Sequence, residues 1–214
     1  IGLLEKWDLD PQTNVELLTI SENATFRAEE PGGRRQIVLR VYRPGYHSQQ
    51  EIESELDWIV ALREEEIVET PEPLIVKTGG LLTSFELEGE HRFVVAFTLM
   101  TGVEPSSTAN LNSSFEQLGA ISARLHQHVR SWKRPTAFVR KIWNFDTTVG
   151  PKSHWGDWRF APKLTKDGEQ LLEKTCLKLK RQLTEFGEGS DRFGLIHADL
   201  RTANLLVEGD RLGI

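Results

Sequence analysis

The sequence predicts an α+β protein in which an antiparallel sheet with one helix is followed by a mainly helical second part. Two patterns carry this prediction. Strand patterns, bounded by turn residues, fill most of residues 15–43 and 79–100, whereas apolar residues recur at helical spacing in 114–129 and 166–187. Because the strand patterns come first and the long helical patterns later, we expect the two kinds of structure in separate lobes.

One helix interrupts the strands of the N-terminal part. Ile52, Leu56 and Ile59 recur at helical spacing, and the acidic residues between them face elsewhere, which is typical of an amphipathic helix. The turn residues Pro31 to Gly33 separate two strands before this helix, and EGEH separates two strands after it. The expected elements are therefore three strands within 15–43, a helix over 49–66 and two strands within 79–100.

The C-terminal part begins after Gly102. Ser113 to Glu116 match a capping box that would open the first helix, and Gly187 would end the second. Two short strands, LLV at 205–207 and RLGI at 211–214, surround the turn EGD, which includes Asp210. A polar loop precedes the first of these strands.

Composition excludes several classes of protein. The 214 residues carry a net charge of −6 with a pI near 5.6, which gives no basic field for nucleic acid. No apolar run approaches the roughly 20 residues of a membrane span, so no membrane partner is expected. A single cysteine cannot form an internal disulfide, and no signal segment is recognisable at the start. We therefore expect a reducing, cytoplasmic setting.

The loop HADLRTANLLV places a carboxylate and an amide five positions apart, at Asp199 and Asn204. Such a loop can present both groups to one spot, and phosphoryl transfer needs a carboxylate to deprotonate a hydroxyl and an oxygen ligand for Mg²⁺. A polar loop that only leads into a strand is the plain alternative. A metal-dependent hydrolase built on His197 and Asp199 lacks the HxH or HExxH spacing that would supply further ligands.

The order of motifs along the chain resembles a known family. H-x-D-x-x-x-x-N is the catalytic-loop signature of the protein-kinase-like fold, and HADLRTANLLV resembles its form in the aminoglycoside phosphotransferase and choline kinase family. Within it, the chain is most similar to bacterial homoserine-kinase-type and stress-response-kinase-like phosphotransferases. The motifs that fall in the expected order are ENATFR, IVLRVYR, ESELDWIVAL, FTLMTG, LGAISARLH, HWGDWR and the loop itself.

This resemblance implies a fold and an activity. The fold is the protein-kinase-like two-lobe fold, with a nucleotide-binding lobe over 1–101 and a catalytic and substrate lobe over 102–214. The activity is the Mg-dependent transfer of the γ-phosphoryl group of ATP to a hydroxyl of a small molecule, such as an amino alcohol, a homoserine-like metabolite or an aminoglycoside. A protein Ser/Thr kinase and a non-catalytic nucleotide-binding protein on the same scaffold are the alternatives.

The resemblance assigns nucleotide contacts to the first lobe. Arg40 would touch the α- and β-phosphates, where protein kinases carry lysine, and Glu55 would pair with it. The turn around Asn23 would approach the phosphates, although it lacks the glycines of protein kinases, so a plain hairpin turn is nearly as good an interpretation. The carbonyl of Thr98 and the amide of Met100 would hold adenine.

In the second lobe, Asp199 would be the catalytic base, Asn204 a magnesium ligand, and Arg201 a cation near the transferred phosphate or a structural ion-pair partner. Between the helices, residues 143–162 hold three of the six tryptophans. Trp155, Asp157 and Trp158 are candidates for binding a small polar or cationic acceptor, and a loop fixed by packed indoles is the alternative.

The family places a second magnesium-binding aspartate shortly after a segment like LGI, and the sequence stops at Ile214. We therefore expect residues 1–214 to be part of a longer kinase, poorly soluble and inactive by itself, and the oligomeric state stays open.

Overall fold

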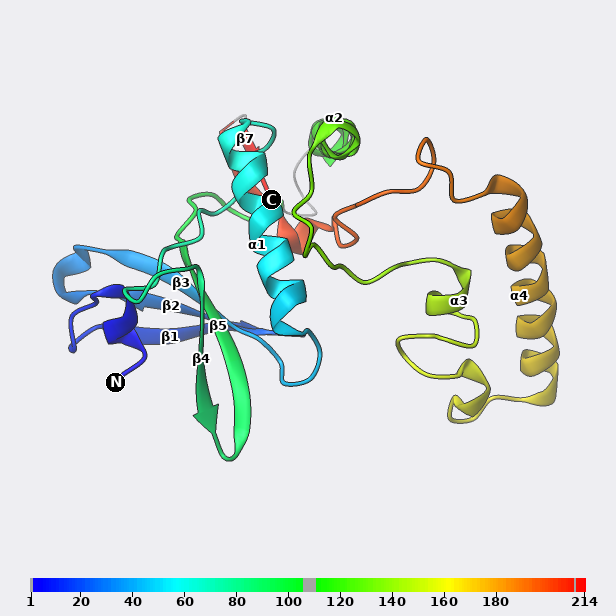
Figure 1. The fold of residues 1–214 in the computed structure, drawn as a ribbon, viewed down its shortest axis with the longest axis horizontal. Coiled ribbons are helices and arrows are strands. Elements are labelled where there is room, and N and C mark those ends of the chain that lie inside the picture. Colours follow the sequence, from blue (N-terminus) through cyan, green and yellow to red (C-terminus); the bar gives the residue numbers. More distant parts are fainter. Residues whose placement is uncertain (1, 106–110, 210) are drawn as a thin grey trace. The chain divides into compact units, whose positions relative to one another are not determined.

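The computed structural model describes residues 2–105, 111–209 and 211–214 and divides the chain into two compact units (Figure 1). The main unit combines Ile1–Val139 with Ile196–Ile214, and the inserted unit is Arg140–Leu195. The expected lobe boundary between 101 and 102 does not coincide with this division and stays a prediction. Asp210, expected in a turn, lies outside the described residues.

A five-stranded antiparallel sheet forms the body of the main unit and confirms the predicted α+β class. The strand order is β1-β2-β3-β5-β4, so the helix between β3 and β4 is followed by strands that pair on the far side of β3. A short 3-10 helix precedes the sheet, and another joins β2 to β3 at the turn predicted there. The bounds are η1 Leu4–Trp7, β1 Asn14–Ile20, β2 Ala24–Glu29, η2 Pro31–Gly33, β3 Gln36–Val41, β4 Leu82–Leu87 and β5 Glu90–Thr98.

Alternation along β3 sends its side chains to two different cores. Ile37 and Leu39 join a buried cluster with Trp7 and Leu9 of the N-terminal segment. Val38 instead packs against the cluster built around Ile52 of helix α1 (Gln49–Glu64). Because successive residues of a strand face opposite sides, Arg40 lies on the same face as Val38, toward α1. This face carries the candidate site.

Helix α1 begins with a complete capping box. Ser48 Oγ accepts a hydrogen bond from Glu51 N, and Glu51 Oε2 accepts one from Ser48 N at 2.9 Å. Ile52 and Leu56 are buried against the sheet, as their periodicity predicts, and Ile59 packs against the same cluster.

The remainder of the main unit is helix α2 (Leu111–Ser131) and the hairpin of β6 (Leu206–Glu208) and β7 (Arg211–Gly213). The hairpin was predicted, but the predicted helix start was wrong: α2 begins at Leu111, so Ser113 to Glu116 lie inside it. A capping-box pattern is local, and the helix begins two residues before it, on its N-terminal side. Helix α2 contacts β7 and buries Leu118, Ile121 and Leu125.

The inserted unit contains α3 (Phe145–Thr148), the 3-10 helix η3 (Trp158–Phe160) and α4 (Lys166–Phe186). Thr165 caps α4, and Gly187 ends it with φ of +82°, as the sequence predicts. No residue of α4, which is described throughout, is buried. None of the helices in the described part of the chain is long and apolar enough to cross a membrane.

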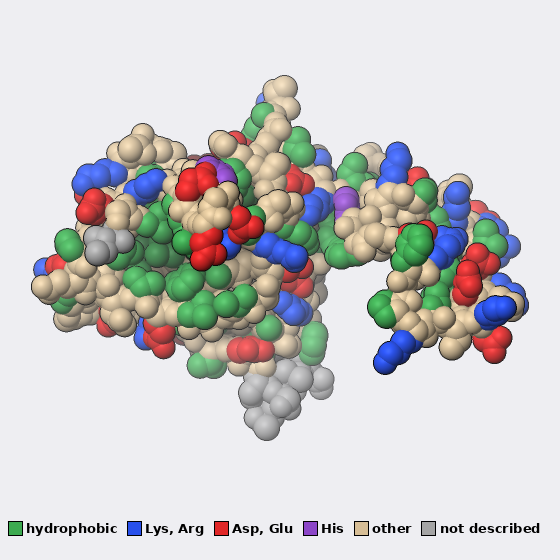
Figure 2. Space-filling model, turned by 90° about the horizontal axis from the view of Figure 1, so that it is seen from below, with side chains coloured by type: hydrophobic (Ala, Val, Ile, Leu, Met, Phe, Trp, Pro, Cys, Tyr) green, Lys and Arg blue, Asp and Glu red, His purple; other side chains and the backbone are tan. Residues whose placement is uncertain are grey.

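Apolar side chains reach the surface of both units, and Figure 2 shows them among charged side chains on the face that it draws. Every residue of edge strand β1 is exposed, so its apolar side chains reach the surface, at Val15, Leu17, Leu18 and Ile20. The predicted stripe of α4 is exposed in the same way at Leu179 and Leu183. Neither strand nor helix therefore adds much to the core.

The link between the sheet and α2 depends on a glycine. Gly102 has φ of +119°, and a Cβ there would lie 2.9 Å from the carbonyl oxygen of Val207. The next residue, Val103, exchanges backbone hydrogen bonds of 3.0 and 2.8 Å with Val207. This bridge attaches the hairpin that follows the polar loop to the end of the sheet, and only glycine permits the approach.

Gly102→Ala is expected to lower the free energy of unfolding by about 1–3 kcal/mol through backbone strain alone, and contact with Val207 adds to this loss. Gly79→Ala is the matched control, because Gly79 has φ of +93° and open space where a Cβ would be. Denaturant unfolding followed by circular dichroism measures both. Equal losses would show that the approach to Val207 is unimportant.

Candidate active site

Arg40 and Glu55 form an ion pair between β3 and α1. Arg40 Nη1 lies 2.9 Å from Glu55 Oε1, and the side chains are 31% and 22% exposed. Strand alternation points Arg40 at the helix, and Glu55 lies one helical turn after Ile52 on the sheet-facing side. The Arg40 guanidinium carbon also lies 5.0 Å from the centre of the Phe97 ring. One carboxylate and one ring face therefore hold a largely buried cation.

The surroundings of Arg40 favour its charged form. Burial lowers the pKa of Arg40, but the interactions with Tyr42 and Glu55 outweigh it and raise this pKa above its ordinary value. The guanidinium is thus a permanent cation. Its planar set of donors can bond Glu55 and still offer N–H groups to a phosphate.

The turn between β1 and β2 is attached to the end of β3 by Asn23. Its Oδ1 accepts a hydrogen bond of 3.2 Å from Arg43 N, and its carbonyl oxygen accepts one of 3.1 Å from Ser21 N. The β2–β3 register places Thr25 opposite Arg40. The Asn23 side-chain oxygen is therefore bonded within the protein, and a phosphate contact at this turn would come from backbone amides or from Asn23 Nδ2.

The predicted adenine contacts lie where β5 ends. Thr98 exchanges two hydrogen bonds of 2.9 Å with the backbone of Glu72, through its own amide and its hydroxyl. The Met100 amide donates to no residue among those described, and the Met100 methyl group lies against Gly213. Phe97 is 2% exposed. An available N–H donor next to apolar side chains is what a purine ring requires.

Within the polar loop, the side chains of Asp199 and Asn204 are in direct contact. Asn204 Nδ2 donates to Asp199 Oδ2 at 2.7 Å and to the Asp199 carbonyl oxygen at 2.9 Å. Both partners are acceptors, which fixes the nitrogen of the amide toward Asp199 and its oxygen away from it. The short 3-10 helix η4 (Thr202–Asn204) provides this geometry by folding the chain back. The Asp199 side chain is 61% exposed, so its carboxylate is open to solutes.

Arg201 and His197 hold the same loop. Arg201 Nε lies 3.3 Å from Asp199 Oδ1, and Asp199 N donates to His197 Nδ1 at 3.3 Å. Between them, Ala198 has φ of +68°, an uncommon conformation for a residue with a side chain. Strained backbone of this kind is concentrated at functional sites.

Sequence reasoning missed Tyr46, which is hydrogen-bonded to the β1–β2 turn and senses the charge of Asp199. Burial, Glu22 and Asp199 raise the pKa of Tyr46, whereas Arg43 lowers it, and the hydroxyl is hydrogen-bonded to Glu22. Glu22 belongs to the β1–β2 turn and Asp199 to the polar loop. The Tyr46 ring packs edge-on against His47 with centroids 4.6 Å apart. Tyr46 lies in the segment RPGYHS at residues 43–48, and nothing in that segment's sequence indicates these partners.

Asp199 and Asn204 supply part of the oxygen ligands that a divalent cation needs. Asp199 offers carboxylate oxygens, and Asn204 Oδ1 accepts no hydrogen bond from the residues that the structure describes. Oxygen donors of these kinds suit Mg²⁺, which also keeps water and phosphate ligands. Across the described ranges no group of three or more His, Cys, Asp or Glu side chains is placed to hold a metal. Nucleotide phosphates would have to complete the set.

The candidate acceptor residues lie in the inserted unit and are engaged with neighbours. The Arg159 guanidinium lies 4.5 Å from the centre of the Trp158 ring and 3.2 Å from Asp157 Oδ1. Backbone and side-chain hydrogen bonds from Arg159 lower the pKa of Asp157. The ring centroids of Trp155 and Trp143 are 4.9 Å apart, and the Trp155 side chain is exposed. Their acceptor role stays a prediction.

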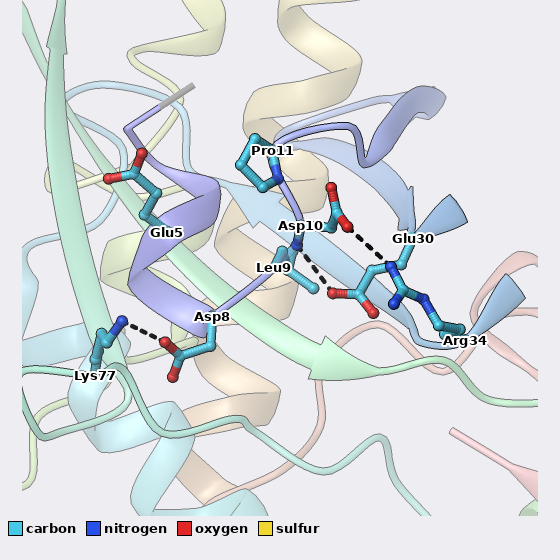
Figure 3. A pocket seen from close by; sticks show the side chains of 8 residues that line it. All are labelled: Glu5, Asp8, Leu9, Asp10, Pro11, Glu30, Arg34 and Lys77. Carbon is cyan, nitrogen blue, oxygen red and sulfur yellow. Dashed lines mark hydrogen bonds and ion pairs between the residues drawn. The ribbon is translucent and has the colours of Figure 1, made fainter. Parts of the chain in front are cut away.

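A cavity of about 350 Å³ lies beside the N-terminal segment of the main unit (Figure 3). Four of its charged side chains form two ion pairs, Lys77 with Asp8 and Arg34 Nη2 with Asp10 Oδ2 at 2.9 Å, and Glu30 accepts from the Asp10 amide at 3.0 Å. The cavity contains none of the predicted site residues. Its ion pairs connect the N-terminal segment to the sheet.

Comparison with known proteins agrees with the geometry. No curated protein sequence matches the chain significantly. The microcompartment-associated aminopropanol kinase is 39% identical over 96% of this chain, with a TM-score of 0.86. Amicoumacin kinase, solved with AMP-PNP, Ca²⁺ and Ami, is 18% identical over 99% of this chain, with a TM-score of 0.75, and shares its fold. The chain spans 63% and 60% of the lengths of these two proteins. The model of the phosphotransferase enzyme family matches residues 16–214, and the chain belongs to this family, with a kinase-like fold.

Proposed function

We propose that the protein transfers the γ-phosphoryl group of ATP to a hydroxyl of a small molecule in a magnesium-dependent reaction. The observation that carries the proposal is the exposed Asp199 carboxylate, bonded to Asn204 and set in the same compact unit as the Arg40–Glu55 pair. The family match over residues 16–214 supports it. A cytoplasmic location belongs to the same proposal.

The main unit supplies the groups that bind the nucleotide. Arg40, oriented by Glu55, bonds the α- and β-phosphates, and the Met100 amide and Thr98 carbonyl bond the adenine edge. Bound Mg²⁺ offsets phosphate charge, and Asn204 Oδ1 with the nucleotide oxygens would hold it. Each of these contacts positions the γ-phosphoryl group relative to the loop around Asp199.

Asp199 then acts on the acceptor. Its carboxylate accepts the hydroxyl proton, the hydroxyl oxygen forms a bond to the γ-phosphorus, and the bond from that phosphorus to the bridging oxygen of ATP breaks. The hydrogen bonds from Asn204 hold the carboxylate in one orientation. Arg201, 3.3 Å from Asp199 Oδ1, places a cation near the transferred charge.

We propose an amino alcohol as the acceptor class. The support is the 39% identical relative, which is an aminopropanol kinase. Trp155, Asp157 and Trp158 supply a carboxylate and aromatic faces of the kind that bind an ammonium group. Asp157 is bonded to Arg159, so an ammonium would have to share or replace that contact.

The test is an ATP-consumption screen of the natural protein with amino alcohols, homoserine, aminoglycosides and a generic protein substrate. Turnover that is highest with an amino alcohol is expected. Preferred phosphorylation of the protein would favour a protein kinase, and nucleotide binding without turnover of any acceptor would favour a non-catalytic protein.

Arg40→Ala is expected to weaken nucleotide binding roughly 10- to 100-fold, because a charge-assisted hydrogen bond contributes about 1.5–3 kcal/mol. Glu55→Gln should weaken it less, since Arg40 keeps its charge. Calorimetric titration with a non-hydrolysable ATP analogue measures both. Arg27→Ala is the control, because Arg27 is also a sheet arginine in an ion pair, 2.7 Å from Glu16 Oε2. Unchanged affinity in Arg40→Ala would remove this residue from the site.

Asp199→Asn is expected to lower turnover by about 10²- to 10⁴-fold through loss of the base, with nucleotide affinity nearly unchanged. The substitution keeps a side-chain oxygen that can accept from Asn204. Steady-state kinetics with the best acceptor measure the effect, and Asp191→Asn, an exposed aspartate paired with Arg192, is the control. Turnover of Asp199→Asn within threefold of wild type would contradict the assignment.

A further inference from the structure

Helix α1 has a second functional face, opposite the sheet. Gln50, Ser54 and Trp58 follow one another at intervals of four residues and therefore lie on one side of the helix. Ser54 and Trp58 are buried there, with 2% and 8% exposure. Ile52 and Leu56, which contact the sheet, lie on the other side.

Each residue of this second face is hydrogen-bonded to the segment at the end of α2 or just after it. We call these contacts the polar seam. Ser54 is its centre, because its hydroxyl donates to Gln50 O at 2.7 Å and accepts from Val139 N at 2.9 Å. The seam consists of Gln50 Nε2 donating to Ala137 O at 2.8 Å, Val139 N donating to Ser54 Oγ, and Trp58 Nε1 donating to His128 Nδ1 at 3.3 Å.

The residues that bond α1 across the polar seam also pack against one another. His128 stacks on Trp132 with centroids 5.6 Å apart, and Trp132 packs edge-on against Phe138 at 5.3 Å. The His128 side chain is 0% exposed, and its Nε2 lies 3.6 Å from Glu65 Oε1 at the end of α1. With Nδ1 accepting from Trp58, the proton of a neutral imidazole is on Nε2, toward Glu65. The partner segment is thus a stack of rings and not a loose loop.

The consequence concerns Glu55, which directly follows Ser54. The sheet contacts fix one side of α1 and the seam fixes the other, so the helix has little freedom to rotate or shift away from Arg40. Because a displacement of about 1 Å in a positioned group can cost roughly 100-fold in rate, a second attachment of this helix affects more than stability.

We propose that the polar seam is a positioning device for phosphoryl transfer, in which Ser54 and His128 fix α1 so that Glu55 holds Arg40 in place. The proposal rests on the proposed function. Ser54 and His128 are buried and are not among the proposed nucleotide or acceptor contacts, so they would act through Glu55.

The test uses the natural full-length chain and compares variants at matched positions. Ser54→Ala removes the acceptor of Val139, and His128→Phe keeps a ring on Trp132 but removes the acceptor of Trp58. Each is expected to lower kcat/KM for ATP roughly tenfold. His128→Asn should restore most of this loss, because its Oδ1 occupies the bonded position of Nδ1. Gln49→Ala is the control: it is next to Gln50 but bonds only Glu53, and wild-type values are expected.

A double-mutant cycle separates positioning from general stability. In a Glu55→Gln background, Ser54→Ala should lower kcat/KM by less than about twofold, since the residue through which the seam acts is already changed. A merely structural role would give the same tenfold loss in both backgrounds. Three results would each overturn the proposal. The first is an equal loss of kcat/KM on Ser54→Ala in both backgrounds, and the second is a kcat/KM of Ser54→Ala and His128→Phe within twofold of wild type. The third is a kcat/KM of His128→Asn as low as that of His128→Phe.

Calorimetry with a non-hydrolysable ATP analogue keeps the two proposals apart. A wild type that binds the nucleotide but phosphorylates no acceptor overturns the proposed function. In that case nucleotide affinity alone tests the positioning role of the polar seam. The role is supported if Ser54→Ala weakens nucleotide affinity in the wild-type background but not in the Glu55→Gln background. Any other result overturns it.

Discussion

The partly buried charge of Arg40 is the constraint on which the rest of the main unit depends. A guanidinium on the inner face of a sheet is costly unless an acid neutralises it, and removal of the acid leaves an uncompensated charge. Helix α1 supplies that acid, with Glu55 Oε1 2.9 Å from Arg40 Nη1. The capping box at Ser48, the apolar contacts of Ile52 and Leu56, and the polar seam all restrict the same helix.

The polar loop follows a different principle, because short-range bonds determine its shape. Asn204, Arg201 and His197 all bond Asp199, within five residues of it in sequence. The loop therefore carries its own geometry, and the strained backbone at Ala198 is held by these contacts. The position of the loop in the main unit is set by the Val103–Val207 bridge next to Gly102, because this bridge attaches the strand after the loop to the segment that follows the sheet.

Sequence reasoning succeeded where structure follows from local patterns. Alternation and helical periodicity predicted the strands of the sheet, α1 and α4, and the loop spacing predicted that Asp199 and Asn204 would lie together. It failed at the start of α2, because a local capping pattern does not exclude a longer helix. It also missed the seam: Ser54 bonds a backbone amide 85 residues away, and neither partner has a distinctive side-chain pattern. Contacts of this kind depend on tertiary structure and have no sequence period.

The nucleotide turn shows how such contacts can replace a motif. Glycine-rich loops let a phosphate approach the backbone, but glycine also leaves the loop mobile. The β1–β2 turn has no glycine, and side chains hold it instead: Asn23 bonds Arg43 N, and Glu22 bonds Tyr46. Tyr46 also interacts with Asp199. Side-chain hydrogen bonds therefore hold this turn to the segment that follows β3, without the backbone freedom of glycine.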